Sequence, residues 1–398
     1  MLDNKRVLVF GVFSLNLISS SVVAEKSPGQ VLDESWEYVC PNAIRGSELE
    51  ARCAGIGGGN NAGIEAGIGN NAGVSSGVGN STVYNDRRNK KIVEERQDKL
   101  KQQRAAGDIL SEERLGFFVS GKLNETEREN TVLESGYESD MQGVTVGVDY
   151  FFTNDFVAGL SVDYMSTDLD YSADAGSSDY ESVSVIAYAN HRVTNEFSID
   201  GYVGWTGVDY DLKRKISYDL TCGCDVVNAT ASSDEDANKV LAGMSFFYTL
   251  SKDALSVTPL LRLNYSGTFL DSYTESGGDG YALDYENQEI QSFESLLGLD
   301  ASYAASFSWG VLLPRIKAGY VHQFLDQRRT IHASFVQDAG SYDLEFKTDK
   351  PDRDYFVFGG GISAILAHGV QFFVDYERVE GHRYINSYTV SGGVRVGL

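Results

Sequence analysis

The last eleven residues, 388–398, read Tyr-Thr-Val-Ser-Gly-Gly-Val-Arg-Val-Gly-Leu. The side chains of a β-strand point alternately to its two faces. One face of this stretch would carry the apolar residues Tyr388, Val390, Val394, Val396 and Leu398, and the other would carry Thr389, Ser391, Gly393, Arg395 and Gly397. The sequence stops on the apolar face without a polar tail. This pattern predicts a strand that closes a membrane β-barrel.

The same period of two starts at Leu115 and continues through the sequence. Eleven further strands are predicted, the first from Leu115 and the others over 144–150, 158–164, 183–189, 197–205, 240–248, 255–265, 293–301, 312–320, 356–366 and 372–376. With the terminal strand, the sequence predicts an all-β membrane protein. Its fold would be a single-chain antiparallel barrel of twelve strands over residues 114–398.

The polar faces of these strands carry many charges, namely Asp149, Asp163, Asp200, Arg262, Glu294, Asp300, Arg315, Lys317, Asp375 and Arg395. A soluble core would not tolerate them, whereas a hydrated lumen would, with the apolar faces turned to lipid. Aromatic residues stand near the predicted strand ends, as interfacial girdles require: Tyr150, Tyr164, Trp205, Tyr265, Tyr320 and Tyr376. We therefore expect the polarity of a membrane barrel.

The connections between the strands alternate in length. Short ones lie at 153–154, 194–195, 251–252 and 368–369, and the longest lie at 211–238, 271–288 and 326–353. In barrels of the bacterial outer membrane the short turns face the periplasm and the long loops face the exterior.

The overall composition agrees with a barrel and argues against one class of partner. Aromatic residues make up 12% of the chain, and the formal net charge is −24. Phosphate binding needs clustered Lys and Arg, so a general nucleic-acid role is not expected.

The first 24 residues have the layout of a secretory signal peptide. Lys5 and Arg6 precede a mostly apolar run at 7–18, and small residues follow up to Ala24. We expect export through the Sec machinery and cleavage between Ala24 and Glu25. No later run approaches the roughly 18 apolar residues of a membrane-spanning helix.

Four cysteines, Cys40, Cys53, Cys222 and Cys224, occur in a chain addressed to an oxidising compartment. We expect disulfides, with Cys40 and Cys53 closing one short loop and Cys222 and Cys224 forming a tight link. A metal site would need further ligands nearby in the sequence, and none stands in register.

Residues 25–85 form a short segment before the barrel. Positions 25–52 show no strong periodicity, and 54–81 repeat Ala-Gly-Ile-Gly and Asn-Asn-Ala-Gly. The repeat fits either a small solenoid or a flexible Gly/Asn linker. Carried to the exterior, this segment would be the only passenger.

Residues 86–113 are predicted to form a polar helix and a short connection to the barrel. The helix over 87–106 lacks Gly and Pro and exposes charges nearly all round, including Arg87, Lys91, Glu95, Arg96, Lys99 and Arg104. About 20 helical residues extend about 30 Å, which matches the hydrocarbon thickness of a bilayer. The helix therefore fits a hydrated pore, and the alternative is an exposed linker helix.

The chain resembles the C-terminal translocator barrel of classical, monomeric autotransporters. The resemblance lies in the strand from Pro259 through Tyr265 into 273–277, in 297–299, in 312–324 and in the terminal strand, where Leu398 replaces the usual aromatic residue. It implies a monomer with a helix in its pore, placed in the outer membrane with lipopolysaccharide by periplasmic chaperones and the barrel-assembly machinery. The terminal strand would serve as the assembly strand.

Catalytic residues are not predicted. The five histidines, His191, His322, His332, His368 and His382, are scattered, and no hydrolase or metalloprotease motif accompanies them. We expect no cofactor and no metal. The leading hypothesis is a non-enzymatic outer-membrane translocator that displays its N-terminal segment at the cell surface. The alternative is an outer-membrane barrel enzyme or a plugged porin-like channel.

Overall fold

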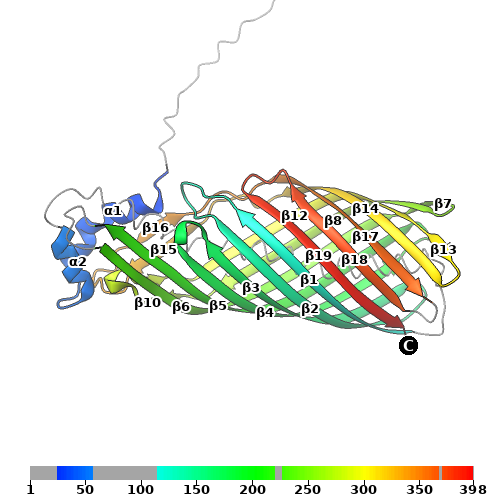
Figure 1. Cartoon of the computed structure of the whole chain (residues 1–398), viewed down its shortest axis with the longest axis horizontal. Helices are drawn as coiled ribbons and strands as arrows, with labels where there is room; N and C mark the ends of the chain where they lie inside the picture. Colours follow the sequence, from blue (N-terminus) through cyan, green and yellow to red (C-terminus); the bar gives the residue numbers. More distant parts are fainter. Residues whose placement is uncertain (1–24, 57–113, 220–225, 367–369, 398) are drawn as a thin grey trace, which may run out of the picture.

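The structure, a computed structural model, describes residues 25–56, 114–219, 226–366 and 370–397. Within these residues, twelve long antiparallel strands form a closed barrel (Figure 1). They are β1 (Leu115–Arg128), β2 (Tyr137–Phe151), β3 (Phe156–Tyr171), β4 (Gly176–Arg192), β5 (Phe197–Asp219), β6 (Val226–Tyr248), β8 (Leu255–Leu270), β12 (Gln288–Tyr303), β14 (Gly310–Gln323), β17 (Asp354–Leu366), β18 (Gln371–Glu380) and β19 (Ile385–Gly397). The predicted fold class is confirmed.

The first and last strands close the barrel. β1 pairs with β19 from Gly116 opposite Gly397 to Arg128 opposite Ile385. On the other side, β1 pairs with β2 along its whole length. Among the described strands, this pairing leaves the membrane-spanning barrel without an open edge, which hydrocarbon would not tolerate.

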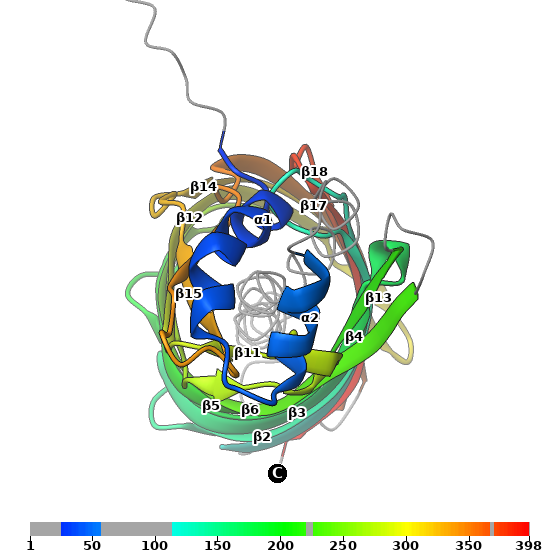
Figure 2. The same ribbon diagram turned by 90° about the vertical axis from the view of Figure 1, so that its left-hand side faces the viewer.

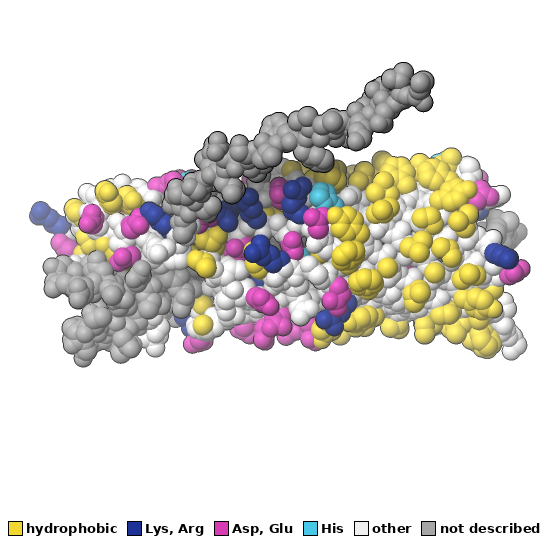
Figure 3. All heavy atoms as spheres, turned by 90° about the horizontal axis from the view of Figure 1, so that it is seen from above, with side chains coloured by type: hydrophobic (Ala, Val, Ile, Leu, Met, Phe, Trp, Pro, Cys, Tyr) yellow, Lys and Arg dark blue, Asp and Glu magenta, His cyan; other side chains and the backbone are white. Residues whose placement is uncertain are grey.

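The strands turn their apolar side chains outward and their polar side chains inward. In the terminal strand, Tyr388, Val390 and Val396 are exposed, whereas Thr389, Ser391 and Arg395 are buried. Leu398 lies outside the described residues. The outward apolar side chains gather over the half of the barrel that carries the C-terminus (Figure 3). The predicted facing of the strands therefore agrees with the structure, and this apolar band is the lipid-facing surface.

Outward positions beyond the apolar band carry charge instead. Glu125, Asp140, Asp168, Asp179, Asp211 and Asp234 are exposed and are direct cross-strand partners on β1 to β6 in that order. We call these six residues the carboxylate row. Like charges directly opposite one another destabilise a sheet, so this arrangement requires water and counterions around it.

The two ends of the barrel differ. Tight turns, β7 (Leu250–Lys252) and β13 (Ala305–Phe307) lie at one end, called here the short-turn end, beside the C-terminus (Figure 1). At the opposite, long-loop end, β5 and β6 extend to 23 residues each. The connection predicted over 211–238 is therefore wrong in extent, because β5 and β6 continue through most of it.

Two other predicted loops also contain structure. Residues 271–288 include β9 (Tyr273–Thr274), β10 (Ser276–Gly277), η3 (Gly278–Gly280) and β11 (Leu283–Tyr285), and residues 326–353 include β15 (Thr330–Phe335) and β16 (Leu344–Lys347). A further turn, η2 (Ser172–Asp174), follows β3. Strands β16, β15, β11 and β9 form a separate sheet at the long-loop end, called here the mouth sheet.

The segment predicted to be irregular, 25–52, is instead mostly helical. It forms α1 (Pro28–Val39), η1 (Cys40–Asn42) and α2 (Glu48–Ile56). Ser27 and Gln30 form a capping box, and Pro28 stands at the first helical turn, so the sequence defines the start of α1 locally. None of the helices in the described residues is long and apolar enough to span a membrane.

The outward apolar band leads to a first prediction. Val146 is 47% exposed on β2 between Val119 and Val162 on the neighbouring strands. We expect Val146→Lys to destabilise the inserted barrel by about 2–4 kcal/mol, because it places a charge in hydrocarbon. Gln142→Lys, on the same strand and face but beyond the apolar band, should cost little. Urea titration of the folded protein in lipid vesicles measures both, and equal losses would contradict the assigned membrane position.

Candidate functional site: the lumen and its capped mouth

The lumen is lined by charges that pair across the strands. All ten predicted inward charges occupy inward positions, and Asp149, Asp163, Asp200, Arg262, Glu294, Arg315, Asp375 and Arg395 are buried there. Arg395 approaches Asp149 at 3.2 Å, and Arg315 approaches Asp375 at 2.8 Å. A passage lined in this way is suited to a polar polypeptide segment and not to apolar molecules.

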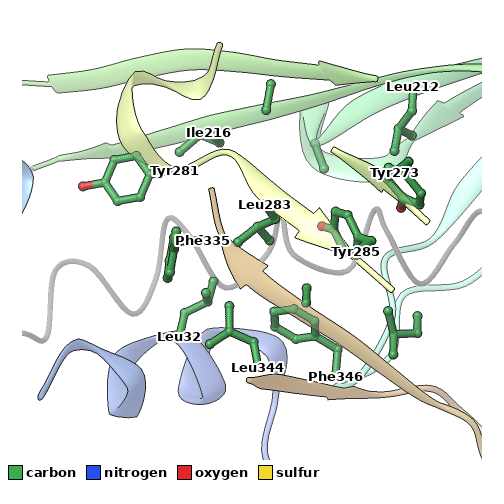
Figure 4. Close-up of a cluster of buried hydrophobic side chains, with 14 of the residues drawn as sticks. Leu32, Leu212, Ile216, Tyr273, Tyr281, Leu283, Tyr285, Phe335, Leu344 and Phe346 are labelled. Carbon is green, nitrogen blue, oxygen red and sulfur yellow. The ribbon is translucent and has the colours of Figure 1, made fainter. Parts of the chain in front are cut away.

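Toward the long-loop end the interior becomes apolar. One core of buried side chains joins the inward ends of β2 to β6, the mouth sheet and the N-terminal helices. Figure 4 shows Leu32 of α1 beside Leu344 and Phe346 of the mouth sheet, with Leu283 and Tyr285 nearby. Hydrophobic burial therefore holds together three parts of the chain that are far apart in sequence.

Residues 25–56, called here the cap, are held in this core by one face of α1. Leu32, Ser35, Trp36 and Val39 are buried at the spacing of one helix face. The indole of Trp36 lies 5.1 Å from the ring of Phe335 and 5.9 Å from that of Tyr281. Figure 2 shows α1 and α2 at the long-loop end of the barrel ring.

Polar contacts fix the second helix of the cap. The backbone N–H of Leu49 donates to Gln337 Oε1 at 2.9 Å, and the guanidinium of Arg52 donates to Asp279 at 3.2 Å. Gly280 has φ of +93°, and a Cβ there would lie 2.7 Å from the Leu49 nitrogen. The close approach of α2 to this turn therefore requires glycine.

The cap has two further ties. A disulfide joins Cys40 to Cys53 and so links η1 to α2. Glu25 forms an ion pair with Arg328 in the loop before β15. The first residue after the expected cleavage site is therefore bound beside the barrel rim.

A buried ion pair attaches a long loop to the barrel wall. Arg214 of β5 donates to both carboxylate oxygens of Glu275, at 2.8 and 2.5 Å, and to the carbonyl of Tyr281 at 2.8 Å. Both side chains are 1% exposed. Removing one partner of such a buried pair would strongly destabilise the protein, because the other charge would be left unpaired. The pair therefore defines the position of the loop that receives α2.

Glu235 brings a carboxyl group into the apolar core. It is buried on β6 beyond the lipid-facing band and accepts a hydrogen bond from Ser233 at 2.9 Å. Its other oxygen and the hydroxyls of Tyr171 and Tyr273 have no hydrogen-bond partner among the described residues. Burial raises the pKa of Glu235 to about 8.

Several predicted residues lie outside the described part of the chain. These are the cleavage-site residue Ala24, the pore-helix residues Arg87, Lys91, Glu95, Arg96, Lys99 and Arg104, and the pair Cys222 and Cys224. Sequence reasoning missed the cap. The apolar spacing of Leu32, Trp36 and Val39 after a capping box could have revealed it.

Comparison with known proteins gives a consistent result. Residues 117–377 match the family model described as "Autotransporter beta-domain". The chain is 25% identical over 298 residues to Outer membrane protein A of Rickettsia conorii. This alignment covers 73% of this chain but only 14% of that protein.

Solved structures show the same fold. The translocator domain of the autotransporter NalP from Neisseria meningitidis superposes with a TM-score of 0.56 and 14% identity, covering 77% of this chain and 97% of that chain. The β-domain of the Bordetella autotransporter BrkA has a TM-score of 0.50 and 15% identity, covering 72% and 100%.

The cap can be tested by removing its central contact. We expect Trp36→Ala to loosen the cap by about 3–5 kcal/mol, because it leaves a cavity in the apolar core. Gly280→Ala should have the same effect from the opposite side of the contact. Glu37→Ala, at an exposed position of the same helix, is the control. Limited proteolysis at residues 25–56 measures the loosening, and equal cleavage of all three variants would refute the docking described here.

Glu235 predicts a pH dependence. Its pKa rises from 4.5 to about 8 in the folded protein, so its contribution is present below about pH 4.5 and is lost as the pH rises through about 8. We expect hydrogen exchange in residues 271–287 to accelerate between about pH 5 and 9 beyond its intrinsic rise. Glu235→Gln should abolish this excess. Asp236→Asn, the outward neighbour, should retain it; an unchanged pH profile in Glu235→Gln would assign the effect elsewhere.

Proposed function

The chain belongs to the autotransporter β-domain family, and on this premise we propose that its barrel carries its own N-terminal segment to the cell surface. The barrel itself is a translocator of the bacterial outer membrane. The chain covers a small fraction of the curated relatives, so the cargo is inferred from this chain alone. The long-loop end would face the exterior and the short-turn end the periplasm.

The observation that carries this proposal is the position of two chain ends. The described segment 25–56 ends with α2, which packs on Gln337 and Asp279 at the long-loop end. The next described segment begins at Arg114, whose carbonyl accepts a hydrogen bond from the Phe151 N–H at 2.9 Å, beside the turn at 152–155. Residues 57–113 therefore have to connect opposite ends of the barrel.

A route through lipid is unfavourable for this connection. Its sequence is polar, and charged or unpaired backbone groups are costly in hydrocarbon. The lumen offers paired charges at membrane depth instead. A helix of about 20 residues spans the bilayer, so the connection is long enough to pass through the lumen.

We further propose that the exported cap stays bound to the barrel. Its apolar face is part of the same core as the mouth sheet, and its first residue pairs with Arg328. The surface-displayed passenger and the two long loops would then together cover the pore.

The barrel would transport and anchor without catalysing a reaction. His322 and His332 pair with Asp354 and Asp343 on exposed surfaces, a solvated arrangement.

The partners belong to the same proposal. Export by the Sec machinery, delivery by periplasmic chaperones and insertion by the barrel-assembly machinery would place a monomer among outer-membrane lipid and lipopolysaccharide. The continuous apolar band around the barrel supports a lipid environment.

Surface labelling tests the export. An epitope inserted after Arg45, in the exposed turn before α2, should bind antibody on intact cells. The same epitope after Asn154, in a short turn, should bind only after the outer membrane is permeabilised. Export is disproved if the first epitope also requires permeabilisation while the barrel is folded, as judged by its heat-modifiable migration in electrophoresis.

A further inference from the structure

We propose that a cavity in the barrel wall at the long-loop end binds a neutral, hydroxyl-rich ligand of the size of a saccharide ring. This binding activity goes beyond export and does not depend on it. The cavity has a volume of about 370 Å³ and lies between β12, the base of the β15–β16 hairpin and the ends of β1 and β19. Small-molecule sites have volumes of about 300–1,000 Å³.

The cavity exists because the barrel wall opens here. β14 ends at Gln323 opposite Glu294 of β12, whereas β12 continues as far as Gln288. The next strand, β17, begins only at Asp354. The base of the β15–β16 hairpin crosses the gap, where the Thr348 N–H donates to the Arg329 carbonyl at 3.0 Å. Two pieces of chain thus enclose a space that regular strand pairing would have filled.

The charged groups around the cavity are held in place. Arg128 donates to Glu134 at 2.5 Å, to Asp349 at 2.7 Å and to the Ser135 carbonyl at 3.2 Å. Its side chain is 3% exposed. A network of this kind keeps its shape without a ligand, which lowers the ordering cost of binding.

The lining is balanced in charge, and this balance indicates the class of ligand. Four cationic residues, Arg128, Arg328, Arg329 and Lys350, face four anionic ones, Glu289, Glu294, Asp349 and Asp352. A site for phosphate or for a polyamine would carry an excess of one sign. Donors and acceptors in equal supply suit hydroxyl groups, which both donate and accept.

Aromatic rings complete the lining. Tyr355 and His382 lie 5.3 Å apart in an edge-to-face arrangement, and the Tyr355 hydroxyl donates to Glu294 at 3.3 Å. A ring surface beside fixed polar groups matches a sugar, which has both apolar C–H faces and polar edges.

The cavity can be reached from water. Its lining includes the exposed residues Gln291, Gln327 and Lys350. On β12 the lipid-facing residues Leu297 and Leu299 lie closer to the short-turn end. The opening therefore lies beyond the apolar band, on the side that the export proposal assigns to the cell exterior.

The test uses the full-length protein in an amine-oxide detergent, which carries no sugar. Glucose, galactose, mannose and N-acetylglucosamine are the probes, with inorganic phosphate and spermidine as charged comparators, and saturation-transfer NMR and calorimetry detect binding. We expect at least one saccharide to bind and neither comparator to compete. Ser292→Phe, which fills the cavity, should abolish binding. Ser266→Phe, at its direct cross-strand partner outside the cavity lining, should not.

A milder pair of variants covers a failure of the buried substitutions to fold. Gln291→Ala removes an exposed lining side chain and should weaken saccharide binding by about three- to tenfold, the loss of one hydrogen bond. Gln142→Ala, exposed on β2 and outside the lining, should leave it unchanged. The proposal is overturned if no saccharide binds, if phosphate or spermidine binds in its place, or if Gln291→Ala and Gln142→Ala bind alike. None of these results bears on surface labelling, so the export proposal stands or falls separately.

Discussion

The closed circuit of backbone hydrogen bonds is the constraint on which the rest of this structure depends. Hydrocarbon offers no partner for an unpaired N–H or C=O, so the pairing of β1 with β19 is the condition under which the other strands can cross the membrane. Closure then creates an interior, and the interior has to be filled or hydrated. This protein does both, with paired charges such as Arg395 and Asp149 at membrane depth and an apolar core at the long-loop end.

Much of the barrel could be predicted from the sequence because each strand carries its own signal. Alternation places Val390 outward and Ser391 inward whatever the partner strand is, and both lie as expected. The mouth sheet could not be found in this way, because strands as short as Tyr273–Thr274 have no period to detect. The cavity could not be predicted from the sequence for another reason. It arises from the early end of β14 relative to β12, which is a property of pairing and not of local sequence.

The cap differs from both cases. A local signal for its first helix is present in the sequence, but the position of that helix depends on long-range contacts. The capping box of Ser27 and Gln30 defines the start of a helix, and the apolar residues that follow define its face. What the face packs against depends on Phe335 and Tyr281, roughly 250 to 300 residues away. The buried pair of Arg214 and Glu275 then determines where that surface stands relative to the wall. A short N-terminal segment can thus be ordered although it has too few residues for a core of its own.

The carboxylate row borders the apolar band on β1 and climbs away from it toward β6, because cross-strand partners on tilted strands do not lie at one depth. On β3 only Ser166 separates the aromatic border residue Tyr164 from Asp168 in the outward direction. Successive outward residues are about 7 Å apart along a strand, so sinking the barrel by that distance would move the carboxylates nearest the apolar band, such as Glu125 on β1, toward the membrane boundary first. Rising by the same distance would expose a ring of apolar side chains to water. The depth of the barrel is therefore set from both sides, by carboxylates that resist deeper insertion and by apolar side chains that resist withdrawal.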